Sequence, residues 1–295
     1  MASLKLRLPS YAEFRVAVIV LIKGVSIMRI SFVGGGMMAE AMIGGILKAK
    51  LATQKESVVG EPSAERRAYL TGKYGIEARA DNVGTVKGAE LVVLSIKPQQ
   101  LGDVMAEMKP NLSKEQVVLS IIAGARMETL TNGLQHQAVV RVMPNTPSQI
   151  GAGMSVWLAT SQVPPVRLEI CRSILTTLGE EVHVADEKFI DMATALSASG
   201  PAYVYLFIEA MIDAGVYMGM QRDMARKLVL QTVMGTTRMV KESGRHPAEL
   251  RDMVTSPGGT TAEALKVFEQ SGFRGTILEA VVAAYQKSKA LGGQR

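Results

Sequence analysis

Short apolar runs that alternate with helix-length segments constrain the fold of this chain more than any other feature. The runs are continuously apolar, namely "RISFV" from Arg29, "SVVG" (57–60), "AELVVLSIK" (89–97), "QVVLSIIAG" (116–124) and "AVVRVM" (138–143). Strands that are apolar on both faces are typical of a parallel sheet covered by helices on both sides. "EEVHVAD" (180–186) alternates more regularly, which is consistent with an edge strand. The first part of the chain is therefore predicted to be α/β.

The strand signal stops after about residue 187, and only helical patterns follow, at 200–220, 222–242, 247–254, 261–271 and 273–291. The first of these is apolar nearly all round, with Glu209 and Asp213 as its only charges. Its length would permit a membrane span, but two central carboxylates make that costly. We expect a helix that is buried between other helices, at a subunit interface.

The length of 295 residues favours more than one domain, because single cores rarely grow beyond ~250 residues. We expect a leader or over-translated extension at 1–27, a dinucleotide-binding Rossmann domain at 28–187 and an all-α domain at 188–293. Met28 stands directly before the first strand, and "VAVIVLI" (16–22) is too short to span a membrane.

The composition narrows the partners and the compartment. The formal charge is +6, but the basic residues are scattered without interleaved aromatics, so no nucleic-acid partner is expected. The single cysteine, Cys171, permits no disulfide framework and is expected to be a small core residue of a cytoplasmic protein. The three histidines show no ligand spacing, so we expect no metal site.

The stretch Gly34-x-Gly36-x-x-Ala39 follows the first strand and opens a helix. In that setting glycines allow a tight turn and close approach of a pyrophosphate to the helix amides, which predicts a dinucleotide site. Ligands of open α/β sheets lie beyond the carboxyl ends of the strands. We therefore expect three later loops to line the crevice: Ser95-Ile96-Lys97-Pro98, Ala123-Gly124 and Pro144-Asn145-Thr146-Pro147. An ordinary solvent-exposed Lys97 is the alternative.

The sequence leaves the choice between NADH and NADPH open. Glu61 ends the second strand, where an acidic residue would accept hydrogen bonds from the ribose 2′-hydroxyl of NAD and repel a 2′-phosphate. Ser63, Arg66 and Arg67 follow at once and could bind that phosphate. Glu65 and the two arginines could equally form a solvated helix face.

A second candidate site is "VTSPGGTTAEAL" (254–265). Thr260 and Glu263 have capping-box spacing, which predicts a helix from Thr261, and Gly258 and Gly259 allow a tight fold before it. The first amides and the hydroxyls of Ser256, Thr260 and Thr261 would then converge on a carboxylate at the positive end of the helix dipole. The alternative is a well-capped helix alone. "SASGPAY" (197–203) is predicted to be a similar helix start.

Several segments resemble the pyrroline-5-carboxylate reductases: "FVGGGMMAEAM", "SIKPQ", "SIIAG", "RVMPNTP", "LSASGPAY", "FIEAMIDAGV" and "HPAELRDMVTSPGGTTAEAL", in the family's order from Met28 to about Leu291. The resemblance implies a Rossmann domain followed by an all-α dimerisation and substrate domain, in dimers that often form larger rings. It implies hydride transfer from NADPH or NADH to the C=N carbon of 1-pyrroline-5-carboxylate, giving proline.

The resemblance also assigns residues. Cofactor contacts are implied for Val33, Gly34, Gly35, Gly36, Met37, Met38, Asn82, Ser95, Ile96, Lys97, Pro98, Ala123 and Gly124, and we add Glu61 from its position. Substrate contacts are implied for Ser256, Gly258, Gly259, Thr260 and Thr261, with Thr261 as the hydrogen-bond donor near the ring nitrogen.

Two residues depart from the family pattern. Ala198 replaces the first glycine of LSGSGPAY, and Glu61 stands where NADPH-using members tend to carry a small hydroxyl residue. Three alternative functions remain at this point: an imine reductase for another cyclic amine, a β-hydroxyacid dehydrogenase, and a non-catalytic dinucleotide sensor. The dehydrogenases usually need a catalytic lysine in the second domain, and no matching motif is evident.

Overall fold

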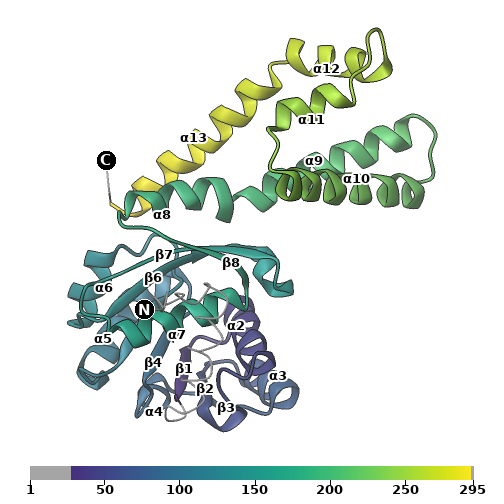
Figure 1. Cartoon of the computed structure of the whole chain (residues 1–295). Helices are drawn as coiled ribbons and strands as arrows, with labels where there is room; N and C mark the ends of the chain where they lie inside the picture. Colours follow the sequence, from purple (N-terminus) through teal and green to yellow (C-terminus); the bar gives the residue numbers. More distant parts are fainter. Residues whose placement is uncertain (1–27, 294–295) are drawn as a thin grey trace, which may run out of the picture. The chain divides into compact units, whose positions relative to one another are not determined.

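The structure is a computed structural model that describes residues 28–293 (Figure 1). The predicted leader at 1–27 lies outside the described residues. The chain divides into two compact units. The first holds the described residues up to Ser120, with Leu130–Val140 and Ala159–Thr177, and the second holds Ile121–Thr129, Arg141–Leu158 and Leu178 onward.

An eight-stranded sheet runs through the described residues in the order β3-β2-β1-β4-β5-β6-β7-β8. The strands are β1 (Ile30–Val33), β2 (Ser57–Gly60), β3 (Glu77–Arg79), β4 (Leu91–Leu94), β5 (Val117–Ser120), β6 (Val139–Pro144), β7 (Gly153–Ala159) and β8 (Gly179–His183). β1 lies between β2 and β4 and is parallel to both, with Ile30 opposite Ser57 and Leu91. The first six strands in this order follow the Rossmann pattern, which confirms the predicted fold class.

The burial of the strands confirms that the apolar runs form the sheet. Every residue of β1, β2, β4 and β5 is buried, as expected for strands covered on both faces. β8 ends the sheet and is mostly exposed, as an edge strand should be. β3 and β7 were not predicted. Thr160, just after β7, donates its amide to the carbonyl of Val139 at 3.0 Å, so β7 runs antiparallel to β6.

Helices connect the strands. They are α2 (Met37–Lys48), α3 (Ala64–Tyr74), α4 (Asn82–Val86), α5 (Leu101–Met108), α6 (Met127–Leu134) and α7 (Pro165–Thr176), with short 3₁₀ turns η1 (Gln54–Glu56), η2 (Pro98–Gln100), η3 (Lys109–Asn111) and η4 (Thr146–Ile150). α2 buries Ala39, Met42, Ile43 and Ile46 along one stripe. Cys171 of α7 is 1% exposed, which confirms it as a core residue.

The second unit ends in helices, which confirms the all-α prediction. They are α8 (Lys188–Ala193), α9 (Gly200–Tyr217), α10 (Arg222–Ser243), α11 (Pro247–Met253), α12 (Thr260–Gln270) and α13 (Phe273–Leu291). α9 and α10 pack side by side, and α13 packs on α8 (Figure 1).

The predicted helix start at 197–203 is confirmed, because α9 begins at Gly200 with Ser199 as its N-cap, but no loop precedes it. α8 continues into α9 through the π turn η5 (Thr194–Ala198), in which the amide of Ser199 donates to the carbonyl of Thr194 at 2.9 Å. Gly200 and Pro201 therefore follow a π turn rather than a loop. Such π turns often occur at functional sites.

Within one chain α9 is covered by α10 but much of its apolar surface is exposed, so its burial at a subunit interface stays a prediction. Gly215 is its buried residue, whereas Val204, Tyr205, Leu206 and Phe207 are exposed. The continuous helix Lys188–Tyr217 is long and apolar enough to cross a membrane by length and composition alone. Its uncovered apolar surface fits the other part of the prediction, an interface between subunits.

Candidate active site

The loop between β1 and α2 is built around glycines that serve different purposes. Gly34 has a φ of +97°, its amide donates to the carbonyl of Gly60 at 2.8 Å, and a Cβ on it would lie 2.8 Å from the carbonyl oxygen of Ser95. Gly36 is the N-cap of α2, and a Cβ on it would meet no atom within 4 Å. Backbone atoms therefore fill the space beside Gly34, whereas the space beside Gly36, in front of the first amides of α2, is open. That open space fits a bound pyrophosphate.

Ser95 joins the end of β4 to this loop. Its amide donates to the carbonyl of Val33 at 2.9 Å, and its hydroxyl donates to the carbonyl of Gly34 at 2.7 Å. Ile96 lies beside the same glycine, with Cγ2 3.0 Å from the position of a Gly34 Cβ. Lys97 and Pro98 are exposed, as are Gly36 and Met37 in the glycine loop. The structure thus brings the 95–98 loop to the glycine loop, as predicted.

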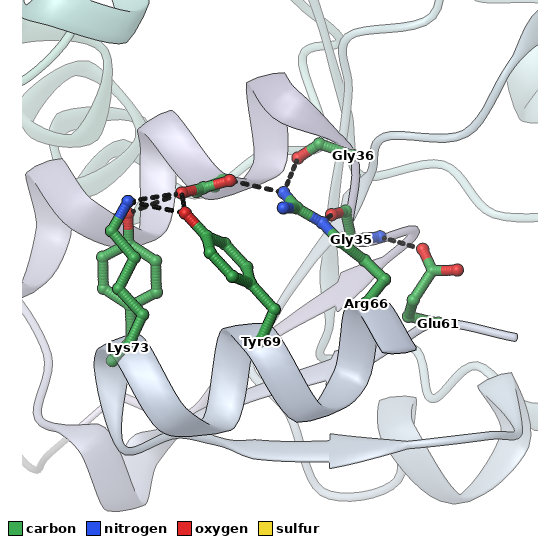
Figure 2. Close-up of polar contacts among 8 residues, drawn as sticks. Gly35, Gly36, Glu61, Arg66, Tyr69 and Lys73 are labelled. Carbon is green, nitrogen blue, oxygen red and sulfur yellow. Dashed lines mark hydrogen bonds and ion pairs between the residues drawn. The ribbon is translucent and has the colours of Figure 1, made fainter. Parts of the chain in front are cut away.

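Glu61 and Arg66 complete this edge of the site (Figure 2). One carboxylate oxygen of Glu61 accepts from the amide of Gly35 at 3.0 Å, and the other accepts from the amide of Ser63 at 2.9 Å. Arg66 Nε donates to the carbonyl of Gly35 at 2.7 Å, and its Nη2 donates to Glu40 at 2.5 Å. The acidic residue and the arginine therefore both contact the glycine loop.

Asn82, the first residue of α4, lies in space beside the carboxyl end of β2. Its Oδ1 is 2.9 Å from the position of a Gly60 Cβ, and its Nδ2 donates to Glu107 at 2.8 Å. Ala123 and Gly124 belong to the second compact unit and are half-buried. There, a Cβ on Gly124 would lie 3.5 Å from Leu291 Cβ at the end of α13.

Asn145, in the third predicted cofactor loop, is held within the second unit. Its Oδ1 accepts from the amide of Met154 at 2.8 Å, and its Nδ2 lies 3.3 Å from the hydroxyl oxygen of Ser197. The loop after β6 is therefore tied to the π turn, which was not expected.

The predicted substrate loop precedes α12 in the second unit, but the predicted capping box is wrong. α12 begins at Thr260 with Gly259 as its N-cap, and Glu263 pairs with Lys266 at 3.7 Å. Gly258 has a φ of +67°, and the amide of Gly259 donates to the carbonyl of Ser256 at 3.0 Å. A glycine N-cap offers no side chain to the first-turn amides, so these donors face a ligand more openly than a capping box would allow.

Three residues of this loop carry hydroxyls at the start of α12. Ser256 and Thr260 are exposed, and Thr261 is half-buried. The position of a Gly259 Cβ lies 2.4 Å from the Ser256 hydroxyl oxygen, so a side chain there would collide with this serine. The arrangement can bind a small anion by amides, hydroxyls and the positive end of the helix dipole.

Comparison with known proteins decides the family. A protein from Synechocystis sp. named pyrroline-5-carboxylate reductase is 42% identical over 264 residues, covering 90% of this chain and 98% of its own length. The chain belongs to the pyrroline-5-carboxylate reductase family. A model for pyrroline-5-carboxylate reductase dimerisation matches residues 187–291, and one for NADP oxidoreductases, coenzyme F420-dependent, matches 29–124.

Solved members of the pyrroline-5-carboxylate reductase family share the fold. The protein from Coxiella burnetii has a TM-score of 0.83 and 34% identity, covering 90% of this chain and 99% of its own. The Plasmodium falciparum protein, solved with NADP bound, has a TM-score of 0.82 and 34% identity, covering 90% and 98%. The match to the dimerisation model supports a homo-oligomer, and the family binds NAD(P).

A partly buried ion cluster in the second unit of this reductase-family chain was not predicted from the sequence. Glu187 accepts from the amide of Met127 at 2.6 Å, from Arg126 at 3.1 Å and from Arg141. Arg141 is 2% exposed, and its Nη2 is 4.0 Å from Asp191. The available signal was a charged residue inside the apolar run "AVVRVM". The cluster joins the segment that follows Ala123 and Gly124 to the start of α8.

Described residues form no group of three or more His, Cys, Asp or Glu side chains that could hold a metal ion.

Proposed function

We propose that the protein is a pyrroline-5-carboxylate reductase, which transfers a hydride from NADH or NADPH to the C=N carbon of 1-pyrroline-5-carboxylate and gives L-proline. This is the last step of proline biosynthesis, placed here in the cytoplasm and carried out by a homodimer or a larger assembly of dimers. We propose no nucleic-acid or membrane partner. The observation that carries the proposal is the glycine-hydroxyl loop at 256–261, within a chain of this family.

The first unit contributes most of the proposed cofactor residues. The open amides at Gly36 and the start of α2 would hold the pyrophosphate, while Val33, Met37 and Met38 flank that loop. The remaining proposed contacts come from Glu61, Asn82, the 95–98 loop and, in the second unit, Ala123 and Gly124. When bound, the reduced dinucleotide supplies the hydride.

The 256–261 loop orients the substrate. The α12 amides and the hydroxyls of Ser256 and Thr260 would fix the substrate carboxylate without a permanent positive charge. Positioning of this kind can supply several kcal/mol of barrier reduction (~7–11 at the extreme).

Thr261 is proposed to donate a hydrogen bond to the ring nitrogen. A pyrrolinium cation is already electrophilic and needs no acid, whereas a neutral imine would need a proton, which the Thr261 hydroxyl could relay. The nearest carboxylate in the motif, Glu263, is exposed and faces Lys266. We therefore assign the reaction mainly to orientation of the two reactants.

The test is the substrate-dependent loss of reduced-cofactor absorbance, with amino-acid analysis of the product. We expect proline in a one-to-one ratio with the cofactor consumed. In a parallel assay 1-pyrroline, which lacks the carboxylate, should show a much higher KM, because the 256–261 loop has no group to hold. Equal efficiency with 1-pyrroline would favour a general imine reductase. Cofactor binding without any turnover would favour a dinucleotide sensor.

A further inference from the structure

The residues at the end of β2 favour one cofactor. We propose that Glu61 makes this protein prefer NADH to NADPH, and that Glu40 reinforces the preference by holding Arg66 away from the 2′-position. The inference rests on the proposed function for the identity of the reaction. Recognition of the cofactor's adenosine ribose, by contrast, can be measured on the protein without substrate.

Glu61 is fixed by the backbone around it. One of its carboxylate oxygens accepts from the amide of Gly35 at 3.0 Å (Figure 2), and the other accepts from the amide of Ser63 at 2.9 Å. A carboxylate oxygen has a second lone pair, so the pair of oxygens can still accept from the two hydroxyls of a ribose. The side chain thus presents a rigid acceptor at the end of the second strand, where NAD-binding folds place one.

A 2′-phosphate has the wrong charge for this position. It carries negative charge where the Glu61 carboxylate already stands, and it has no hydroxyl to donate. Moving Glu61 aside would break its hydrogen bonds to Gly35 and Ser63. The hydrogen bonds from Gly35 and Ser63 therefore hold Glu61 in place, so that it cannot easily move away from a 2′-phosphate.

Arg66 is the obvious candidate to offset that repulsion, but its guanidinium is engaged elsewhere. Nε donates to the carbonyl of Gly35 at 2.7 Å, and Nη2 donates to Glu40 at 2.5 Å and to the carbonyl of Gly36 at 3.4 Å (Figure 2). The guanidinium also lies over the ring of Tyr69, 4.9 Å from its centroid. Its charge is directed toward α2 and the glycine loop.

Arg67 and Ser63 are engaged in a similar way. Arg67 Nη1 donates to the carbonyls of Glu61 and Pro62 at 2.7 and 2.8 Å, and the Ser63 hydroxyl accepts from the amide of Arg66 as the N-cap of α3. One nitrogen of Arg67 and the Ser63 hydroxyl are therefore used to build the turn after β2.

Glu40 makes the position of Arg66 costly to change. Burial opposes its ionisation, but hydrogen bonds from side chains of α3 outweigh that effect and lower the pKa of Glu40 from 4.5 to about 2; the donors are Lys73, Arg66, Tyr69 and Tyr74. Freeing Arg66 would remove one donor from a carboxylate that is only 12% exposed. Glu40 is thus a positioning residue for cofactor choice.

The test measures the dissociation constants of NADH and NADPH for the full-length protein, without substrate, by quenching of protein fluorescence or by calorimetry. We expect NADH to bind at least about ten-fold more tightly, a factor that corresponds to about 1.4 kcal/mol. Glu61→Ser should shift the ratio toward NADPH by a similar factor. Glu61→Gln, which keeps an acceptor oxygen but not the charge, should shift it less far in the same direction.

Two further variants separate local from general electrostatics. Glu65→Gln removes the same charge from an exposed position in the first turn of α3 and should leave the ratio unchanged. Glu40→Gln should raise the affinity for NADPH modestly by itself, because Arg66 is released, and further where Glu61 is also replaced. Equal or tighter binding of NADPH by the unaltered protein would overturn the inference, as would an equal shift from Glu65→Gln.

The outcomes also separate this inference from the proposed function. Tighter NADH binding without reduction of 1-pyrroline-5-carboxylate would refute the function and leave the inference standing. Proline formation with equal binding of the two cofactors would do the reverse.

Discussion

Ser288, near the end of α13, donates a 2.9 Å hydrogen bond to Asp191 of α8, and both residues are almost completely buried. The contact fixes the last helix of the chain to the helix that opens the dimerisation region. Arg126 and Arg141 lie 3.9 and 4.0 Å from the same carboxylate, so Asp191 balances buried positive charge as well. Replacing Asp191 should therefore lower the free energy of unfolding more than replacing Ser288.

Asp191→Ala should destabilise the protein by about 3 kcal/mol, because it leaves Arg126 and Arg141 with Glu187 in place of two carboxylates and removes the acceptor of the buried Ser288 hydroxyl. Ser288→Ala removes one hydrogen bond and should cost only about 1 kcal/mol. Urea unfolding followed by circular dichroism measures both. Similar losses for the two variants would show that the charge balance at Asp191 contributes little.

The carboxylate of Glu40 should make stability depend on pH. Its pKa is lowered to about 2 in the folded protein against 4.5 as the ordinary value, so its contribution is complete above pH 4.5 and is lost as the pH falls toward 2. We expect Glu40→Gln to cost on the order of 2 kcal/mol near neutral pH, since Lys73 is half-exposed and solvent weakens that pair. The difference from the unaltered protein should shrink steadily below pH 4.5. A difference independent of pH would contradict the assignment.

Gly34 and Gly36 should respond differently to alanine. Gly34→Ala should lower the melting temperature, because its Cβ would meet the carbonyl of Ser95 and its φ of +97° is unfavourable for other residues. Gly36→Ala should fold normally, since its Cβ would meet open space, yet weaken dinucleotide binding by about ten-fold or more as the methyl group obstructs the pyrophosphate. Calorimetry on both variants tells the two effects apart.

Thr261→Ala should lower kcat while the dissociation constant of the dinucleotide stays nearly unchanged. Thr261 lies in the first turn of α12, outside the compact unit that contains the glycine loop. Loss of one hydrogen-bond donor of this type typically costs about 1–3 kcal/mol of barrier, or roughly ten- to hundred-fold in rate. Thr261→Ser should restore most of the rate. An equal loss of turnover and cofactor affinity would indicate disturbed folding instead.

The apolar runs predicted most of the sheet, because buried parallel strands have a composition that is visible locally. β3 was missed since Glu77–Arg79 is short and polar, and β7 since "GMSVWLA" has no regular alternation. The helix at the substrate loop was found one residue from its true start. Gly259 takes the N-cap position that the spacing of Thr260 and Glu263 had suggested for Thr260.

Other features depend on long-range contacts and leave no local signal. The hydrogen bonds that join Glu61 to Gly35, and Arg66 to Glu40, connect residues 26 positions apart. The sequence placed Glu61, Arg66 and Arg67 near the cofactor, but it could not show which acceptors the arginines would find. The π turn before α9 was missed for a different reason, because Gly200 and Pro201 are equally compatible with a helix that follows a loop.

The most direct test of the proposed reaction follows the hydride itself. The protein is incubated with 1-pyrroline-5-carboxylate and NADH carrying deuterium at both C4 positions, and the product is analysed by NMR and mass spectrometry. We expect direct hydride transfer, which gives L-proline with a single deuterium on the ring carbon that is bonded to nitrogen and does not bear the carboxylate. Proline without deuterium at that carbon, or no proline despite demonstrable NADH binding, would contradict it.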